Sequence, residues 1–275
     1  LLLTFLLASS AHAACPATLR FADTGLEGAE ELQRAYAEFV GVMQARLDAR
    51  IEFFPVGNRT TAINALRFRQ VDVVVAGPSE YVLMRERVPG VQPIAAIQRP
   101  DYRAVFVVRA DSPIRSLDDL RGRHVAMKDH GSTTGHILPS LMLREAGLDL
   151  DRDLRVTLLG GARMAALASG EVDAVGTGIR DLAPAQAQFG AERFRVIAEG
   201  DDAPGDPFVA GAHLSAACVA RLQSVFEAEG EAILRAILAP GQQDKYLDAR
   251  MVEVVDADYE PLRQTYRALG LSRGR

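Results

Sequence analysis

Two stretches of the chain, ALRFRQVDVVVAG at residues 65–77 and ALASGEVDAVGTG at residues 166–178, have the same form. In each stretch a helical segment ends, a short polar turn follows, and a Val-Asp pair leads into an apolar run that closes on glycine. The run VDVVVAG is continuous enough to predict a strand buried on both faces, as in a parallel sheet covered by helices. The repeat therefore predicts two similar α/β lobes within one chain.

Short β-rich runs and longer helical runs alternate on both sides of these stretches. The first half is expected to hold strands at residues 18–23, 50–56 and 71–77, with helices at 28–48 and 60–70. The second half is expected to hold strands at 102–110, 124–128, 154–160, 172–178 and 193–200, with helices at 132–147 and 162–170. A short helix capped by Ser116 is expected at 116–120, and DDAPGDP at 201–207 is expected to form a turn. Each lobe is therefore predicted to be a mostly parallel sheet flanked by helices.

We divide the chain into residues 1–13 as a signal peptide, 14–107 plus 209–275 as lobe 1, and 108–208 as lobe 2. Strands that run from one lobe to the other would leave a cleft between them. Ligands of α/β sheets bind at the carboxyl ends of strands, beside the helix starts that follow. We therefore expect the functional residues in the loops that follow the buried strands.

The overall composition excludes several classes of protein. The 275 residues include 48% hydrophobic and 24% charged residues, with a formal net charge of −5 and a pI near 5.6. No basic run is long enough for a nucleic-acid or anionic-membrane surface, so the predicted partners are small molecules or proteins. The start, LLLTFLLASSAHA, is a short apolar run that ends in the cleavage pattern Ala-His-Ala at residues 11–13, which predicts an exported protein.

Two cysteines, Cys15 and Cys218, would both remain after that cleavage. In an oxidising compartment they could form one disulfide, but the sequence does not establish that they lie close together. Cys15 could instead be the lipidated cysteine of a lipoprotein. That alternative is weaker, because His12 stands where a lipoprotein needs a large aliphatic residue.

The loop GSTTG at residues 131–135 places three hydroxyl side chains, Ser132, Thr133 and Thr134, before an expected helix. The free N–H groups and the dipole at a helix start bind anions, and hydroxyls add donors. Pro139 is tolerated only in a first turn, so the helix is expected to begin near residues 134–136. N-capping alone would need one hydroxyl, so three of them favour a site for a small oxyanion.

Other side chains at expected helix starts could face the same cleft. Ser79 and Tyr81 follow the buried strand at 71–77, although Ser79 could equally belong to a Gly-Pro turn. Arg163 could bind an anion through its guanidinium, or it could be a solvated surface arginine. His136 could contact the ligand or simply face solvent.

No catalytic or metal-binding pattern emerges. The histidines lack the H-E-x-x-H spacing, the two cysteines form no zinc pattern, and neither a G-x-S-x-G elbow nor a P-loop is present. We therefore predict a protein that is not an enzyme and that uses no metal or cofactor.

Four motifs, in order, resemble those of the phosphate, phosphite and phosphonate-binding proteins of ABC importers: VDVVVAGPSEY (71–81), YRAVFVV (102–108), DSPIRSLDDLRGR (111–123) and GSTTGHILP (131–139). The resemblance extends over about residues 18–210 and implies the type II periplasmic-binding-protein fold. It also implies ligand contacts. The oxyanion-binding loop of the family falls on residues 132–134, and its two tyrosines fall on Tyr81 and Tyr102. Arg163 stands where the family has a histidine, and Gly178 where it often has an aspartate.

The resemblance further implies that two lobes close on a small phosphorus oxyanion (phosphonate, phosphite or phosphate) by hinge bending and deliver it to an ABC permease in the inner membrane. We expect a periplasmic monomer. The alternative is a ligand-sensing module that binds another small oxyanion, such as a sulfonate, and reports to a receptor. The exchange of an acidic group for a cation at residues 163 and 178 would suit a more fully ionised anion, or a ligand without an amine.

Overall fold

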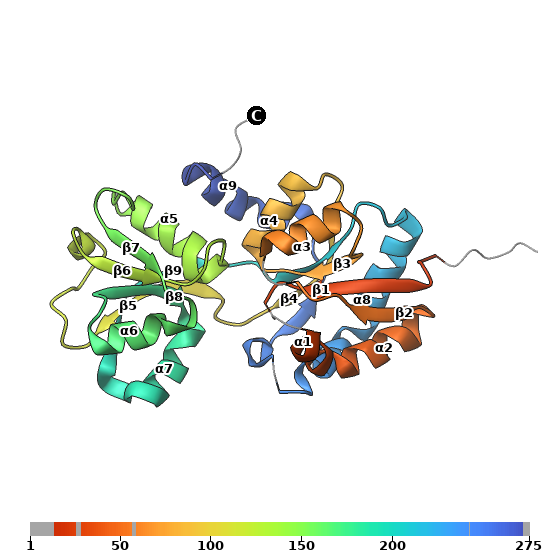
Figure 1. Cartoon of the computed structure of the whole chain (residues 1–275), viewed down its shortest axis with the longest axis horizontal. Coiled ribbons are helices and arrows are strands. Elements are labelled where there is room, and N and C mark those ends of the chain that lie inside the picture. Colours follow the sequence, from red (N-terminus) through yellow and green to blue (C-terminus); the bar gives the residue numbers. More distant parts are fainter. Residues whose placement is uncertain (1–13, 26–28, 57–58, 242, 272–275) are drawn as a thin grey trace, which may run out of the picture.

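The computed structural model describes residues 14–25, 29–56, 59–241 and 243–271. Two lobes lie side by side, and each is built on its own β-sheet with helices on both faces (Figure 1). The predicted α/β, two-lobe architecture is confirmed. The predicted signal peptide, residues 1–13, lies outside the described residues.

The first lobe contains a six-stranded sheet with the order β11-β4-β10-β3-β1-β2. The strands are β1 (Thr18–Asp23), β2 (Arg50–Phe53), β3 (Val73–Val75), β4 (Gln92–Gln98), β10 (Asp206–Ala210) and β11 (Arg250–Val252). The second lobe contains a five-stranded sheet with the order β7-β6-β8-β5-β9. Its strands are β5 (Arg103–Arg109), β6 (His124–Met127), β7 (Arg155–Leu158), β8 (Ala174–Gly178) and β9 (Phe194–Asp202).

Both sheets follow one plan. A parallel triplet, β2-β1-β3 in the first lobe and β7-β6-β8 in the second, is followed by an antiparallel strand that arrives from the other lobe. That strand is β10 beside β3 and β5 beside β8. A further strand, β4 or β9, pairs antiparallel with it. The predicted parallel core is therefore present in each lobe, and the crossing strands make each sheet mixed.

The Val-Asp pair of the sequence repeat has the same structural role in both lobes. Asp72 accepts a hydrogen bond from the backbone N–H of Arg20 at 2.8 Å, and Asp173 accepts one from the N–H of His124 at 2.9 Å. In each case the aspartate's own N–H bonds back to that residue's carbonyl at 2.8 Å. Arg20 lies in β1 and His124 in β6, so each aspartate joins the third strand of its parallel triplet to the central one.

The turn before each Val-Asp pair is also the same. Arg69 and Gly170 occupy equivalent positions and both have left-handed backbones, with φ of 58° and 84°. The next residue donates its N–H to the carbonyl of the first alanine of the repeat, at 2.8 Å and 2.9 Å. The turn thus stops the helix and directs the chain into the buried strand.

Helices cover both faces of each sheet (Figure 1). In the first lobe, α3 (Arg59–Arg67), α4 (Pro78–Arg87) and α9 (Glu260–Ala268) bury one apolar cluster, and α1 (Ala29–Ala35), α2 (Ala37–Leu47) and α8 (Ala216–Leu238) bury the other. In the second lobe, α5 (Leu138–Glu145) covers one face, and α6 (Arg163–Ser169) and α7 (Leu182–Phe189) cover the other. All three valines of β3 are buried, as predicted for a strand between two helical layers.

Two short crossovers, residues 99–102 and 203–205, join the lobes. They run beside each other, and the N–H of Ala203 donates to the carbonyl of Tyr102 at 2.7 Å. Because the whole of β5 pairs in the second sheet, strand pairing favours a lobe boundary between residues 98 and 103, earlier than residue 107.

Two of the predicted helices differ from the structure. The helix expected at 28–48 is interrupted at Tyr36, between α1 and α2. The short helix expected at 116–120 is a 3-10 turn, Asp118–Leu120, and Ser116 does not cap it: its hydroxyl bonds the Asp119 carboxylate at 3.3 Å, and the same carboxylate accepts the N–H of Ser116. Among the described residues, no helix is both long and apolar enough to cross a membrane.

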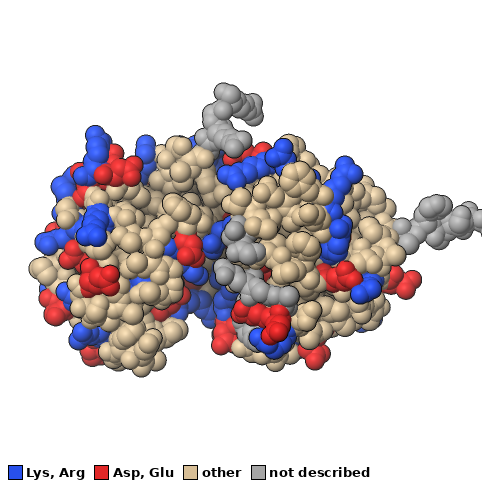
Figure 2. All heavy atoms as spheres, in the orientation of Figure 1, with Lys and Arg blue, Asp and Glu red and all other residues tan. Residues whose placement is uncertain are grey.

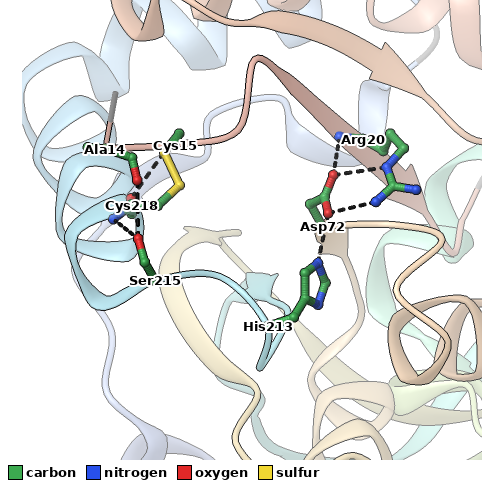
Figure 3. Close-up of a disulfide and its surroundings, with 7 residues drawn as sticks. All are labelled: Ala14, Cys15, Arg20, Asp72, His213, Ser215 and Cys218. Carbon is green, nitrogen blue, oxygen red and sulfur yellow. Dashed lines mark hydrogen bonds and ion pairs between the residues drawn. A yellow bond between two sulfur atoms is a disulfide. The ribbon is translucent and has the colours of Figure 1, made fainter. Parts of the chain in front are cut away.

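Cys15 and Cys218 form a disulfide, with Cα atoms 4.6 Å apart (Figure 3). The bond ties the segment before β1 to the first turn of α8. Ser215 caps that helix by accepting the N–H of Cys218 at 3.1 Å, and its hydroxyl donates to the carbonyl of Ala14 at 3.1 Å. The structure resolves the alternatives for these cysteines in favour of a disulfide, and a sulfur in that bond cannot carry a thioether-linked lipid.

Candidate functional site

The two lobes meet where α4 of the first lobe faces residues 131–135 of the second lobe, the loop with three hydroxyl side chains, here called the hydroxyl loop. Ser79, at the start of α4, donates its backbone N–H to Thr133 Oγ1 at 3.2 Å, and the two hydroxyls lie 2.8 Å apart. The Ser79 hydroxyl also donates to the carbonyl of Gly131 at 2.6 Å. Both side chains are buried. Two of the predicted site residues, 54 positions apart in the chain, are therefore in direct contact across the lobes.

The hydroxyl loop leads into a π-helical turn, η2 (Thr133–Ile137), which continues directly into α5. The turn begins one residue before the predicted range. Pro139 has no N–H to bond the carbonyl of Gly135, which instead accepts the N–H of Lys128 at 2.8 Å. The proline thus ties the helix start to the end of β6. π-Helical turns are rare and are frequent at functional sites.

Ser132 is the residue before this turn, and its side chain is buried without capping the helix. The N–H groups of residues 136 and 137 bond its backbone carbonyl at 3.0 Å and 2.9 Å. N-capping, the simpler explanation for a serine here, is therefore not what its hydroxyl does.

Tyr102 lies in the first crossover, buried beneath the guanidinium of Arg99, whose central carbon is 3.4 Å from the ring centroid. Burial raises the pKa of the Tyr102 phenol, while Arg99 and a hydrogen bond with Thr133 oppose that rise. The phenol is therefore neutral and can donate a proton to an oxygen. Through its hydrogen bond with Thr133, Tyr102 connects the first crossover between the lobes to the hydroxyl loop.

Arg163 is buried and fully engaged within the second lobe. It donates to Thr177 Oγ1 at 2.9 Å, to the carbonyl of Gly160 at 2.6 Å and to Asp181 Oδ2 at 2.7 Å. Burial would raise the pKa of Asp181, but the Arg163 guanidinium and the Thr177 hydroxyl outweigh it and hold that pKa below its usual range. Of the two alternatives for Arg163, the solvated surface residue is wrong, and its charge is compensated by Asp181.

Thr134 lies beside Gly178, on the same side of the second lobe as the Arg163–Asp181 pair. A Cβ atom at residue 178 would lie 2.9 Å from Thr134 Oγ1 and 3.5 Å from Asp181 Oδ2. The N–H of Gly178 also donates to Asp181 Oδ2 at 3.2 Å. The absence of a side chain at residue 178 therefore leaves room for the third hydroxyl, and Asp181 supplies a carboxylate three residues later.

Glu80 and Arg59 form the first-lobe side of the contact. The buried Glu80 carboxylate accepts the N–H of Gly77 at 2.8 Å and also bonds the Thr24 hydroxyl and the Arg59 guanidinium. Arg59 reaches across to Asp129 of the second lobe, at 3.7 Å. The carboxylate thus fixes an arginine at the edge of the hydroxyl loop.

His136 supports the loop from within. Its Nδ1 accepts the N–H of Gly131 at 3.3 Å, and its ring packs edge-on against His130. Burial, with His130 and Arg59 nearby, lowers the pKa of His136 to about 4. The imidazole is therefore neutral near pH 7, so at that pH it adds no positive charge to the site.

Tyr81 is not part of this cluster. Its hydroxyl bonds the Asp256 carboxylate, and its ring packs against Tyr259, 4.6 Å between centroids. Two helical residues after Ser79 the side chain has turned by about 200°, so it faces away from the hydroxyl loop. The structure places Tyr81 in the packing between α4 and the C-terminal segment.

Charged side chains gather along the furrow between the lobes (Figure 2). Arg180 of the second lobe makes another contact there, donating to the carbonyls of Lys245 and Leu247 at 3.2 Å and 3.1 Å. Two grooves lie elsewhere: one of about 670 Å³ between α5, β9 and α9, and one of about 1020 Å³ between α8 and β11. None of the predicted site residues lines either groove.

The chain matches, over residues 26–259, the family described as "ABC transporter, phosphonate, periplasmic substrate-binding protein". It belongs to that family. The match spans both lobes and the whole contact between Ser79 and the hydroxyl loop. The chain is therefore the substrate-binding component of an ABC transporter, and the resemblance noted in its motifs is confirmed.

Relatives of this phosphonate-binding family have low but extended identity to the chain. The phosphate-import protein PhnD of Mycolicibacterium smegmatis is 23% identical over 278 residues, covering 93% of this chain and 87% of that protein. The phosphonates-binding periplasmic protein of Escherichia coli is 26% identical over 208 residues, 72% of this chain and 62% of that protein. The structure of PhnD1 from Prochlorococcus marinus with methylphosphonate superposes with a TM-score of 0.73 at 18% identity, covering 93% and 99% of the two chains. The fold is thus the predicted type II periplasmic-binding-protein fold.

Sequence reasoning did not assign Lys128, Glu80 or Asp181 to the site. Glu80 and Asp181 are the carboxylate partners of the two arginines, and each lies a few residues into a helical segment that follows a buried strand. That shared position, three residues after the glycine closing each repeat, was a signal in the sequence.

Proposed function

We propose that this substrate-binding protein captures a small phosphorus oxyanion, a phosphonate, phosphite or phosphate, between its lobes and delivers it to the transporter's membrane permease. Ser132, Thr133 and Thr134, with Ser79 and Tyr102, are the proposed ligand-binding residues. Arg163 and His136 would support the site: Arg163 fixes Asp181 and Thr177, and His136 holds the loop at Gly131. Tyr81 would act only through packing.

The observation that carries the proposal is the direct contact between Ser79 and Thr133. It brings together the starts of two helical segments, α4 and η2 with α5, whose dipoles both present partial positive charge. Two positive helix ends facing each other repel, and an anion between them relieves that repulsion. Donors of this kind suit the several acceptor oxygens of an oxyanion.

Ligand capture would depend on bending at the two crossovers between the lobes, which would act as a hinge. In the structure the lobes satisfy each other's donors through the Ser79–Thr133 bonds, and an incoming oxyanion would exchange these bonds for stronger, charge-assisted ones. The crossovers at 99–102 and 203–205 would bend to admit it and close again. The closed form would then dock on the permease. No covalent step is required.

Several further properties are part of the proposal. The apolar start of the chain, residues 1–13, would direct export, and the disulfide fits an oxidising compartment such as the periplasm. The protein would act as a monomer and would not be an enzyme, since it has no activated nucleophile in its sequence motifs. A role in binding, without catalysis, agrees with the substrate-binding family to which the chain belongs.

A thermal-shift panel tests the proposal. Phosphate, phosphite, methylphosphonate, 2-aminoethylphosphonate and sulfate would be added to the full mature chain at about 100 times the dissociation constant. A ligand at that level adds about 2.7 kcal/mol, which raises the melting temperature by roughly 5–10 °C in a chain of this size. No shift with any of these ligands would refute the proposal.

A double variant tests the site. Ser132→Ala with Thr133→Ala should abolish binding in calorimetry, because it removes two hydroxyl donors. The matched control is Ser140→Ala with Thr265→Ala, two buried hydroxyls that bond carbonyls of their own helical segments at 2.7 Å and 3.1 Å. Equal affinity in the two double variants would place the site elsewhere.

A further inference from the structure

Lysine is nearly absent from this protein. Lysine and arginine together number 31, and only two of them, Lys128 and Lys245, are lysines. Lys128 directly follows β6 and lies under the hydroxyl loop, while Lys245 lies at the inter-lobe contact with Arg180. A chain that otherwise uses arginine thus places a lysine, a compact point charge without a planar fork, at the proposed binding site.

The side chain of Lys128 runs along the start of the helix that follows the hydroxyl loop. A Cβ atom at Gly135 would lie 2.5 Å from Lys128 Cβ, 3.3 Å from its Cδ and 3.0 Å from Ser132 Oγ. The backbone of Lys128 is fixed there by its bond to the carbonyl of Gly135. The lysine stem therefore occupies the space that a glycine leaves open, next to the hydroxyl of Ser132.

The charge of Lys128 is not compensated by an ion pair, whereas the charges of the two neighbouring arginines are. Arg59 is paired with Glu80, and Arg163 with Asp181. No carboxylate among the described residues lies within ion-pair distance of the Lys128 ammonium. Burial, and then the Arg163 guanidinium, lower the pKa of Lys128, while Asp181 opposes them. Arg59 also lowers it and Asp129 also opposes it, so the nearby arginines and carboxylates offset one another. The half-buried ammonium itself has no ion-pair partner among the described residues, and a bound anion would supply one.

We propose that Lys128 binds the ligand's charge directly and makes the protein prefer a fully ionised oxyanion without an ammonium group. This inference rests on the proposed function and names its substrate class. A dianion would pair with Lys128 while its oxygens accept the hydroxyls of residues 132–134. An aminoalkylphosphonate would bring a second ammonium close to that of Lys128, and the repulsion between the two like charges disfavours it. The preference thus arises at Lys128, since the charge of Arg163 is already matched by Asp181.

Calorimetry on Lys128→Met tests the assignment. Methylphosphonate and 2-aminoethylphosphonate would be titrated into wild type, Lys128→Met and the control Arg123→Met at mildly alkaline pH. Arg123 is exposed at the opposite end of β6, so its loss removes one charge from the same strand away from the site. Lys128→Met should weaken methylphosphonate binding by about 10- to 100-fold, as expected for a hydrogen bond to a charged group. It should weaken 2-aminoethylphosphonate less, and Arg123→Met should stay within about twofold for both ligands.

Equal affinity of the Lys128→Met and Arg123→Met variants for methylphosphonate would overturn the assignment and leave the proposed function standing. Wild type that binds neither ligand, phosphate nor phosphite would overturn both. Acetylation of wild type by an amine-reactive ester, followed by mass spectrometry, covers the case of a variant that fails to fold. Saturating methylphosphonate should slow acetylation of Lys128 at least several-fold, and an unchanged rate would contradict direct binding.

Discussion

Replacing both cysteines, Cys15→Ser with Cys218→Ser, should destabilise the protein substantially without affecting its ligand affinity. The disulfide joins residues 203 positions apart. In the chain-entropy description, closing a loop of that length removes about 5 kcal/mol of entropy from the unfolded state, and measured losses for native disulfides are about 2–5 kcal/mol. We expect a loss of about 3–5 kcal/mol, a large part of the roughly 5–15 kcal/mol that stabilises a typical protein.

The assay is urea unfolding of oxidised wild type and of the double serine variant. With a slope of about 3 kcal/mol per molar urea, the midpoint should fall by roughly 1 M or more. The disulfide lies at α8 and the segment before β1, away from the hydroxyl loop, so ligand affinity should stay within about twofold. Coincident urea midpoints would refute the reasoning, and titration of two free thiols in unfolded wild type would show that the bond had not formed.

Three other substitutions test the hinge, the histidine and the glycine of the loop. Arg99→Met removes the ion-pair partner of the buried Asp206 carboxylate at 3.0 Å and leaves it only the Tyr246 hydroxyl, which donates to it at 3.0 Å. The free energy of unfolding should fall by about 3 kcal/mol, and a loss below about 1 kcal/mol in urea unfolding would contradict this. His136 takes up a proton near pH 6.5 in the unfolded chain and near pH 4 in the folded one, so unfolding free energy should fall as pH falls between these values. We expect its contribution to be roughly 2 kcal/mol, allowing for partial exposure, and His136→Gln should remove that part of the slope between pH 7 and pH 4.5. Gly135→Ala places a Cβ 2.5 Å from that of Lys128 and should weaken methylphosphonate binding at least tenfold in calorimetry; wild-type affinity would show that the lysine stem can move at no cost.

The sequence repeat predicted the centre of each lobe because its residues have local and long-range roles that agree. The valines of β3 alternate between two apolar clusters, and the Val-Asp aspartate bonds the neighbouring strand. A polar turn, an aspartate and an apolar run in fixed order therefore specify the same unit twice. Because the local and long-range roles agree, the repeated unit could be predicted from this one sequence, without an alignment of related sequences.

Three strands were missed wholly or in part. Neither β4 nor β11 was predicted, and β10 begins inside the segment expected to be a turn. β4 and β10 each contain a proline, Pro93 and Pro207, which lacks the N–H of a ladder. The two strands pair with each other, with a register shift at residues 208–209 opposite Pro93. Their pairing is set by the crossover from the second lobe, which no local pattern predicts.

The candidate site was predictable where a residue acts from the start of a helix, and not where a partner decides its role. The contact of Ser79 with Thr133 follows from two helix starts that meet. Arg163 could not be interpreted correctly from sequence, because its charge is cancelled by Asp181 in the next helical segment. Tyr81 carries the family pattern, but the helical rotation after Ser79 turns it toward Asp256.

The paired crossovers determine how the lobes can move. Residues 99–102 and 203–205 form a narrow two-stranded ribbon, joined by the bond from Ala203 to Tyr102. A ribbon of this kind bends easily out of its own plane and twists, but bending within the plane would stretch one edge and compress the other. The relative motion of the lobes is then restricted mainly to two rotations, a bend and a twist. Two distances between probes on the lobes, measured for differently placed pairs of probes, would be enough to tell these rotations apart.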